Sequence, residues 1–443
     1  MEGARGQGLW VAVRTRPATA WEAKQPCLLQ LDTRSLKYLG PECFSNVFSY
    51  DAIFEQQATQ SQVFGSIQGI VLSVLQGFNA SICAYGQTGS GKTHSLFGDI
   101  GSASDRGIVP RAMAAVCTGV SASTEDCKFS LTMSIVEIYC EKIRDLLNLG
   151  NENLQVQQDK VRGVSLANAY EASISSEDQL MSIMQHGLSN RAVAATAMNT
   201  GSSRSHCIVM LMLRKQFPDG RSQHSKLCLV DLAGSERSDK SITAGQTLDE
   251  GIQINKSLSA LGNVVNALTD NRATHVPYRD SKLTRVLQDS LGGNAKTALI
   301  ICCSPCMSNA GETLSSLRFG ARAKGIINLV QTNACSSAGK DAADLLVKAR
   351  RECDELRSQV KKLEGLQAEL LASGSAEDAG KLAQLAAAKA EDAEGLGNTD
   401  RKCCQQAASA AQSRMVLLSF SISMVQMLAS GAYVWWRGAT CTQ

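Results

Sequence analysis

The sequence predicts an α/β fold in which helices cover both faces of a central, mostly parallel β-sheet. Short apolar runs that resemble buried strands alternate with helical patterns through residue 330, as is typical of α/β domains. A glycine-rich loop, residues 86–93, directly follows one of these apolar runs. From Leu346 onward, apolar or small residues recur three and four positions apart, which predicts a short C-terminal coiled coil.

The loop after Ala80–Tyr85 fits the pattern Gly-x4-Gly-Lys-[Ser/Thr]. Glycines let a backbone wrap round phosphates with its N–H groups directed inward, while the lysine adds positive charge and the threonine can ligate Mg²⁺. A helix beginning near Lys92 would direct its positive dipole end at the same anion. A glycine-rich turn that fits by chance is the alternative. We therefore expect a P-loop NTPase-type fold whose nucleotide ligands are Gly86, Gln87, Thr88, Gly89, Ser90, Gly91, Lys92 and Thr93.

Composition limits the other function classes. The chain has 443 residues, 44% hydrophobic and 19% charged, which is typical of a globular protein. A net charge of +3 does not predict a nucleic-acid partner, so any basic binding face must be local. The 16 scattered cysteines suit a reducing compartment, and the pair Cys303 and Cys306 lacks further metal ligands, which favours a strand end. The N-terminus lacks a secretory signal, so we expect a cytoplasmic protein.

Local patterns predict the remaining elements. Leu9–Arg14 alternates like a strand that Pro17 would end, and Arg14 and Arg16 are either solvated charges or a platform for a purine ring. Further expected strands are Phe129–Tyr139, Cys207–Arg214, Lys226–Asp231 and Ala298–Cys303. Expected helices are Thr59–Leu75, Glu141–Leu147, Ser176–Ala194, Thr247–Leu268 and Gly311–Ala323.

The strand Lys226–Asp231 ends on a carboxylate, which is the usual place for a second Mg²⁺-site residue downstream of a phosphate loop. Gly234 follows it and can offer a backbone N–H to a γ-phosphate. The helix 247–268 carries Lys256 on its polar side, and the segment 276–291 after it is basic. The chain therefore has the parts of a site that responds to the terminal phosphate.

These motifs together resemble the kinesin motor domain over residues 8–333. The signatures occur in the expected order: RTRP at Arg14–Pro17, AYGQTGSGKTHSLF at Ala84–Phe97, EIYCEKIRDLL at Glu137–Leu147, NTGSSRSH at Asn199–His206, DLAGSE at Asp231–Glu236, NKSLSALGNVVNAL at Asn255–Leu268 and HVPYRDSKLTRVLQDSLGGN at His275–Asn294. The sequence departs from the family at Cys140, where asparagine is usual. It also departs in residues 237–246, where a glycine and an acidic residue are lost.

The resemblance implies a role for each matching residue. The adenine-side pocket would comprise Arg14, Arg16, Pro17 and His94. The Mg²⁺-side residues would be Thr93, Ser203 and, through water, Asp231. Gly234 would sense the γ-phosphate, and Arg204 with Glu236 would form, when ATP is bound, an ion pair that helps position the hydrolytic water. The microtubule-binding residues would be Lys240, Lys256, Arg279, Lys282 and Arg285.

The resemblance also assigns residues 1–333 to the motor domain, with Arg322–Asn333 as a neck linker in which Ile326 and Asn333 match docking positions. Residues 334–344 would be a flexible hinge, and 345–371 a homodimeric coiled coil or a single amphipathic helix on the motor. After an alanine-rich spacer, residues 372–414, the uncharged segment 415–436 is long enough for a C-terminal membrane anchor that could bind vesicle cargo, or for a buried or self-associating helix.

From the resemblance we expect a microtubule-stimulated ATPase with ATP and Mg²⁺ as cofactors, cytoplasmic and associated with microtubules, moving towards plus ends. The alternative is a non-motile microtubule-binding or membrane-tethering protein with a weakly active head. A GTPase is disfavoured because the sequence has no Asn-Lys-x-Asp guanine-recognition run.

Overall fold

The structure is a computed structural model that describes residues 5–40, 47–124, 126–159, 163–197, 202–236 and 248–333. The chain forms two compact units, Met1–Ala343 and Asp344–Gln443, and the described residues belong to the first. The predicted hinge, coiled coil, spacer and apolar segment lie outside the described residues, as does Lys240. In the described ranges, no helix combines the length and apolar character needed to cross a bilayer.

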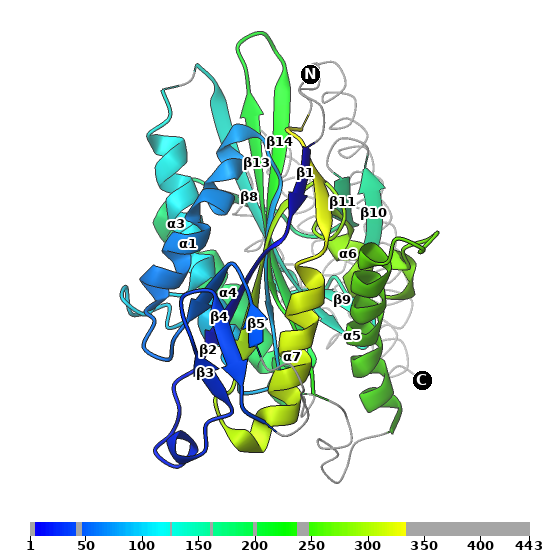
Figure 1. The fold of residues 1–443 in the computed structure, drawn as a ribbon. Helices are drawn as coiled ribbons and strands as arrows, with labels where there is room; N and C mark the ends of the chain where they lie inside the picture. Colours follow the sequence, from blue (N-terminus) through cyan, green and yellow to red (C-terminus); the bar gives the residue numbers. More distant parts are fainter. Residues whose placement is uncertain are drawn as a thin grey trace, which may run out of the picture. The chain divides into compact units, whose positions relative to one another are not determined.

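A mixed β-sheet forms the centre of this unit (Figure 1), with the strand order β12-β8-β13-β14-β7-β15-β2-β6 and β9 paired to β8. From β14 to β6 neighbouring strands are parallel, and from β12 to β14 they are antiparallel. The predicted P-loop NTPase-type fold is confirmed, but the sheet is mixed and not mostly parallel, because β13 and β14 form an antiparallel hairpin and β8, β9 and β12 continue the antiparallel half. The strands are β2 (Trp10–Thr15), β6 (Ala52–Phe54), β7 (Ala80–Tyr85), β8 (Lys128–Tyr139), β9 (Lys142–Asp145), β12 (Ala172–Ile174), β13 (His206–Gln216), β14 (Ser222–Asp231) and β15 (Lys296–Cys303).

Helices cover both faces of the sheet because its strands are apolar on both sides. Successive residues of β15 alternate between two cores: Leu299 and Ile301 pack with α5, α6 and α7, whereas Ala298 and Ile300 pack with α1, α3 and α4. Strands buried on both faces are typical of the parallel centre of an α/β sheet. The helices are α1 (Gln60–Leu72), α2 (Lys92–Leu96), α3 (Ile108–Ser121), α4 (Glu177–Ala197), α5 (Leu248–Thr269), α6 (Lys282–Val286) and α7 (Ala310–Ala323).

Most predicted elements are confirmed to within a few residues. Thr59 caps α1 through a capping box with Gln62, so the helix begins where the sequence indicates. β15 ends at Cys303, as expected for the Cys-x-x-Cys pair. Two smaller antiparallel sheets complete the unit apart from the neck: β3 (Leu28–Gln30), β4 (Ser35–Tyr38) and β5 (Val47–Ser49) form one, and β10 (Gln155–Asp159) with β11 (Gly163–Ala167) forms the other.

The expected helix 141–147 is wrong. Residues 142–145 form the strand β9, which pairs antiparallel with β8 from Tyr139 to Val136. The turn between the strands has Cys140 at φ 47° and Glu141 at φ 59°, and two successive left-handed residues are typical of a type I′ hairpin turn. These residues form a strand although their pattern is helical, because Ile143 is fully buried in the core beside β8. A tertiary contact has overridden local propensity.

The predicted neck segment lies along the motor unit. Its strand β16 (Ile327–Val330) pairs antiparallel with β1 (Arg5–Gly8) at the N-terminus (Figure 1). Ile326 is fully buried, and the side chain of Asn333 hydrogen-bonds to Asn79, Asn294 and the carbonyl of His224. Both residues proposed as docking positions are therefore packed against the core.

Candidate nucleotide-binding site

The phosphate loop, residues 86–93, joins the buried strand β7 to α2. Gly89 and Gly91 have φ of 74° and 98°, a left-handed conformation that favours glycine. Gly86 has φ 149°, and a Cβ there would collide with the carbonyl oxygen of Cys302. The loop therefore needs glycine for its backbone angles and for its close approach to β15.

Lys92 lies inside this loop with only 7% of its surface exposed. Its Nζ donates to the carbonyls of Gly86 at 2.8 Å and Gln87 at 2.9 Å, so backbone carbonyls of the phosphate loop hold the ammonium group in place. Burial lowers the pKa of Lys92, while the charge of Asp231 acts in the opposite direction. The nearby carboxylate thus favours the charged form that phosphate binding requires.

Thr93 and Asp231 meet as the sequence predicts. The Thr93 hydroxyl donates to Asp231 Oδ2 at 2.8 Å, and Asp231 is 1% exposed at the end of β14. Asp231 Oδ1 is buried, and none of the residues that the structure describes forms a hydrogen bond with it. A buried, unpartnered carboxylate oxygen beside a hydroxyl offers the oxygen ligands that Mg²⁺ takes, so these residues fit the ion.

Arg191 is a site residue that the sequence reasoning missed. It projects from α4, and its guanidinium group lies 3.0 Å from Asp231 Oδ2 and 3.9 Å from Glu137 Oε1 of β8. Leu180, Met184 and Arg191 are spaced four and seven apart and are all buried, so they share one face of the helix. A charge on the buried face of a helix is the signal that could have identified it.

The residues after β14 contact the phosphate loop and the 3-10 helix Ser202–Arg204. We call residues 232–236 the sensor loop. The N–H of Gly234 donates to the carbonyl of Ser203 at 2.7 Å, and the N–H of Ser235 donates to the carbonyl of Gly86 at 3.1 Å. The 3-10 helix Ser202–Arg204 therefore lies directly against the sensor loop.

Glu236 contacts the phosphate loop itself. Its Oε2 accepts the backbone N–H of Thr88 at 2.8 Å, and its Oε1 accepts the Thr88 hydroxyl. A carboxylate on this N–H shows that the donor is directed at an anion. Across the described residues, no ion pair joins Arg204 to Glu236; the recorded partner of Glu236 is Thr88.

The adenine-side residues are held by hydrogen bonds. Arg14 is 8% exposed and donates to Gln60 Oε1 at 2.8 Å and Ser95 Oγ at 3.0 Å, and burial lowers its pKa. Arg16 forms a bidentate pair with Glu22, and this bond lowers the pKa of Glu22 to about 2. Both guanidinium groups are therefore held by neighbouring side chains. The remaining two residues, Pro17 and His94, are exposed.

The predicted microtubule-binding residues that the structure describes lie on α5 and the segment after it. Lys256 and Arg279 are exposed. Lys282 donates to Gln155 Oε1 at 2.9 Å, and Arg285 donates to Gln158 Oε1 at 3.4 Å, so the strand β10 orients both side chains. The Glu141 carboxylate accepts from the Ser281 hydroxyl at 2.8 Å and the Lys282 N–H at 2.7 Å, which caps the start of α6.

Two features place the chain among the P-loop nucleotide-binding proteins. The backbone N–H of Thr88 in the phosphate loop binds a carboxylate, and Asp231 Oδ1 has no hydrogen-bond partner among the described residues. The pattern of the kinesin motor domain matches residues 32–326, which is more than half of the sequence. The chain belongs to the kinesin motor domain family.

Individual relatives agree with this assignment. The chain is 45% identical over 367 residues to a kinesin heavy chain of Syncephalastrum racemosum, covering 81% of this chain and 39% of that protein. It is 47% identical over 322 residues to kinesin-related protein 3 of Dictyostelium discoideum, covering 72% and 27%. The chain thus spans less than half the length of either relative. A solved structure described as a fast kinesin, with implications for ATPase mechanism and interactions with microtubules, matches at TM-score 0.70 and 43% identity, covering 74% of this chain and 94% of that one.

Proposed function

We propose that this protein is a microtubule-stimulated ATPase that converts ATP hydrolysis into movement along microtubules. The observation that carries the proposal is the contact of the sensor loop with the phosphate loop, through Ser235 and Glu236, and with the 3-10 helix Ser202–Arg204, through Gly234. A loop held by bonds that a γ-phosphate would replace can change position when that phosphate binds or leaves. Family membership supports both the nucleotide and the microtubule.

The residues present suit ATP and Mg²⁺. Lys92 and the N–H groups of the phosphate loop would hold the β- and γ-phosphates. Thr93, Ser203 and Asp231 would hold Mg²⁺, Asp231 through water, and the ion would neutralise charge on the phosphate oxygens. Gly234 would give its N–H to the γ-phosphate, while Glu236 leaves Thr88 and pairs with Arg204 to orient the attacking water. Phosphoryl transfer to water then needs alignment and charge stabilisation more than a strong base.

Replacement of Glu236 by alanine tests this role. We expect Glu236→Ala to bind ATP and to hydrolyse it at least about 100-fold more slowly, because misplacement of a reacting group by about 1 Å can cost that much. Glu152→Ala is the matched control, since its side chain is 69% exposed and, among the described residues, its partner is Arg144 in a surface ion pair. Wild-type turnover by Glu236→Ala would remove Glu236 from the mechanism. Comparison of ATP with GTP turnover separates the ATPase from a GTPase.

Movement is tested by gliding of polarity-marked microtubules on the surface-attached full chain. A plus-end-directed motor moves filaments with their minus ends leading, and the neck strand β16 lying along the core supports this direction. A tether would hold filaments still in ATP, which would favour the non-motile alternative. The exposed cations Lys256 and Arg279 suit the acidic surface of tubulin, so binding should weaken as salt rises.

The proposal extends to the sequence beyond residue 333. The apolar spacing of residues 345–371 supports a homodimer, and sedimentation of the full chain at several concentrations tests it. The uncharged run 415–436 supports a membrane anchor that carries vesicle cargo. Retention of the full chain in carbonate-washed membranes would support the anchor, and complete extraction would refute it.

A further inference from the structure

His206 is a buried histidine whose ring touches two elements outside its own strand. It is the first residue of β13 and follows the 3-10 helix Ser202–Arg204. Its exposed fraction is 2%, and its backbone pairs with Ile138 of β8. Burial lowers the pKa of His206 to about 3, helped by the charges of Arg191 and Lys92, so the ring is neutral near pH 7.

The hydrogen bonds of the ring determine its tautomer. Nδ1 lies 3.0 Å from the backbone nitrogen of Ala233, which can only donate, so Nδ1 is the acceptor. A neutral imidazole then carries its proton on Nε2, which lies 2.8 Å from the hydroxyl oxygen of Ser257. The ring therefore accepts from the sensor loop and donates to Ser257, which is 4% exposed on α5.

The hydrogen bond of the Ala233 N–H differs from those of the neighbouring N–H groups in the sensor loop. The N–H groups of Leu232, Gly234 and Ser235 donate to the backbone carbonyls of Ala84, Ser203 and Gly86. Ala233 alone in this run of four donates to a side chain, and that side chain continues to α5. If the N–H of Gly234 turns towards a γ-phosphate, the preceding residue, Ala233, must either move with it or limit its movement. The N–H of Ala233 is bonded to His206.

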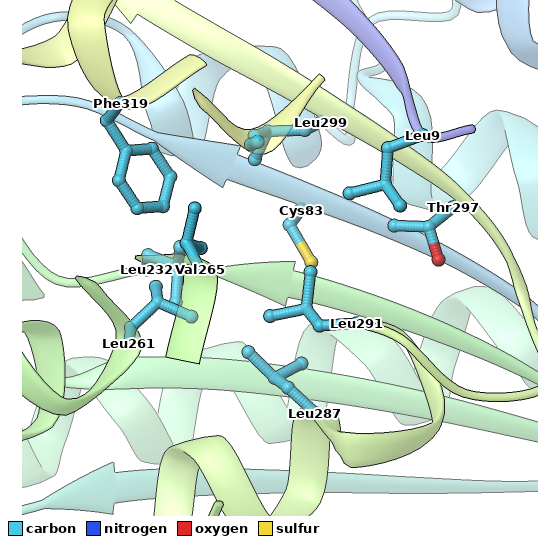
Figure 2. A pocket seen from close by; sticks show the side chains of 11 residues that line it. Leu9, Cys83, Leu232, Leu261, Val265, Leu287, Leu291, Thr297, Leu299 and Phe319 are labelled. Carbon is cyan, nitrogen blue, oxygen red and sulfur yellow. The ribbon is translucent and has the colours of Figure 1, made fainter. Parts of the chain in front are cut away.

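Apolar packing also lies between the sensor loop and α5. Leu232 lines the same cavity as Leu261 and Val265 of α5, together with Cys83, Leu299 and Phe319 (Figure 2). Leu232, Leu261 and Val265 are all buried in one core cluster, so apolar contacts also join the sensor loop to α5. The imidazole bridge is a directional contact between the same two elements.

We propose that His206 is a positioning residue that couples the sensor loop to α5, so that the state of the phosphate site reaches the filament-docking helix through the Ala233–His206–Ser257 bridge. This inference rests on the proposed motor function. It differs from a purely structural role, in which the ring fills space and its loss affects every state of the protein equally.

Ser257→Ala is the primary test because it leaves the imidazole and its bond to Ala233 in place. His206→Asn is the second variant, because its side-chain oxygen can accept from Ala233 but cannot reach Ser257. Ser66→Ala, on the exposed side of α1, is the control for the same chemical change. In the full chain we expect both bridge variants to keep unstimulated ATP turnover and to lose about tenfold in microtubule-stimulated turnover, as the loss of one hydrogen bond predicts.

Amide exchange of α5 is a second readout that needs no filament. In the wild type, exchange of α5 should differ between ADP and a slowly hydrolysed ATP analogue, and Ser257→Ala should abolish the difference. Wild-type stimulation together with a wild-type exchange difference in Ser257→Ala would overturn the inference. An equal fall in unstimulated and stimulated turnover with a lower Tm would also overturn it, because the bridge would then be structural. A wild-type chain that microtubules do not stimulate, but whose α5 difference is lost in Ser257→Ala, would refute the motor function and support the bridge.

Discussion

Docking of the neck strand β16 should depend on the side chain of Asn333. Asn333 Nδ2 donates to Asn79 Oδ1 at 2.8 Å and to the carbonyl of His224 at 2.6 Å, and its Oδ1 accepts from Asn294 Nδ2 at 3.0 Å. Asn333→Ala removes these three bonds while the backbone N–H of residue 333 can still donate to the carbonyl of Gly77.

The expected magnitude follows from the count and the exposure of these bonds. Each contributes about 0.5 to 1.5 kcal/mol net, and water can replace part of the loss because the bonds are only partly buried. In the variant Asn79 Oδ1 can still accept from the N–H of Lys226, which lies at 3.1 Å, so this oxygen is not left without a donor. We therefore expect the docked neck to lose about 2 kcal/mol, which makes undocking about 30-fold more frequent.

Hydrogen exchange of the β16 amides measures this directly. Exchange through local opening should become about 30-fold faster in Asn333→Ala at constant nucleotide. Gln331→Ala is the matched control, because the bond that Gln331 forms with the described residues is made by its backbone N–H, which donates to Asn294 Oδ1 at 2.8 Å. Unchanged exchange in Asn333→Ala, or equal acceleration in both variants, would refute the reasoning.

Further predictions concern a strained turn, a helix cap and a buried histidine. Cys140→Asn should raise the free energy of unfolding by about 1 kcal/mol in urea denaturation, since asparagine tolerates the left-handed φ of 47° better; no gain would mean that the turn is unstrained. Glu141→Ala leaves the Lys282 N–H without its carboxylate, so microtubule affinity in co-sedimentation should fall severalfold while unstimulated turnover stays; unaltered affinity would exclude Glu141 from ordering α6. The unfolded chain protonates His206 near its ordinary pKa of 6.5 but the folded chain only near 3, so stability is full above 6.5 and falls by about 2 kcal/mol between pH 7 and pH 5. His206→Asn should flatten that part of the stability profile, and an equally steep profile would contradict the assignment.

The conformation of the phosphate loop could be predicted because its residues are contiguous. Gly86 through Thr93 act through backbone angles and through spacing along one strand–turn–helix unit. Asp231 and Gly234 follow a buried strand in the same way. Parallel neighbours align the carboxyl ends of β7 and β14, which brings Thr93 to Asp231.

The sequence did not predict groups that depend on packing between distant segments. Arg191 reaches Asp231 because α4 packs beside β8, and only the strand β13 separates β8 from β14 in the sheet. Glu236 contacts Thr88 in this structure, whereas the family resemblance pairs it with Arg204. The Glu236 carboxylate has two possible partners. The three-dimensional arrangement selects between them, and the spacing of residues along the sequence does not predict that arrangement.

The sequence by itself determined the phosphate loop, the α/β class of the fold and the position of Asp231 at the end of a buried strand, since these follow from local backbone chemistry and from apolar periodicity. Tertiary structure alone decided that residues 142–145 extend the sheet, that Arg191 enters the site and that His206 joins the sensor loop to α5. The physical reason is that burial selects among locally allowed conformations and partners. The free energy of that choice comes from contacts between segments far apart in the chain.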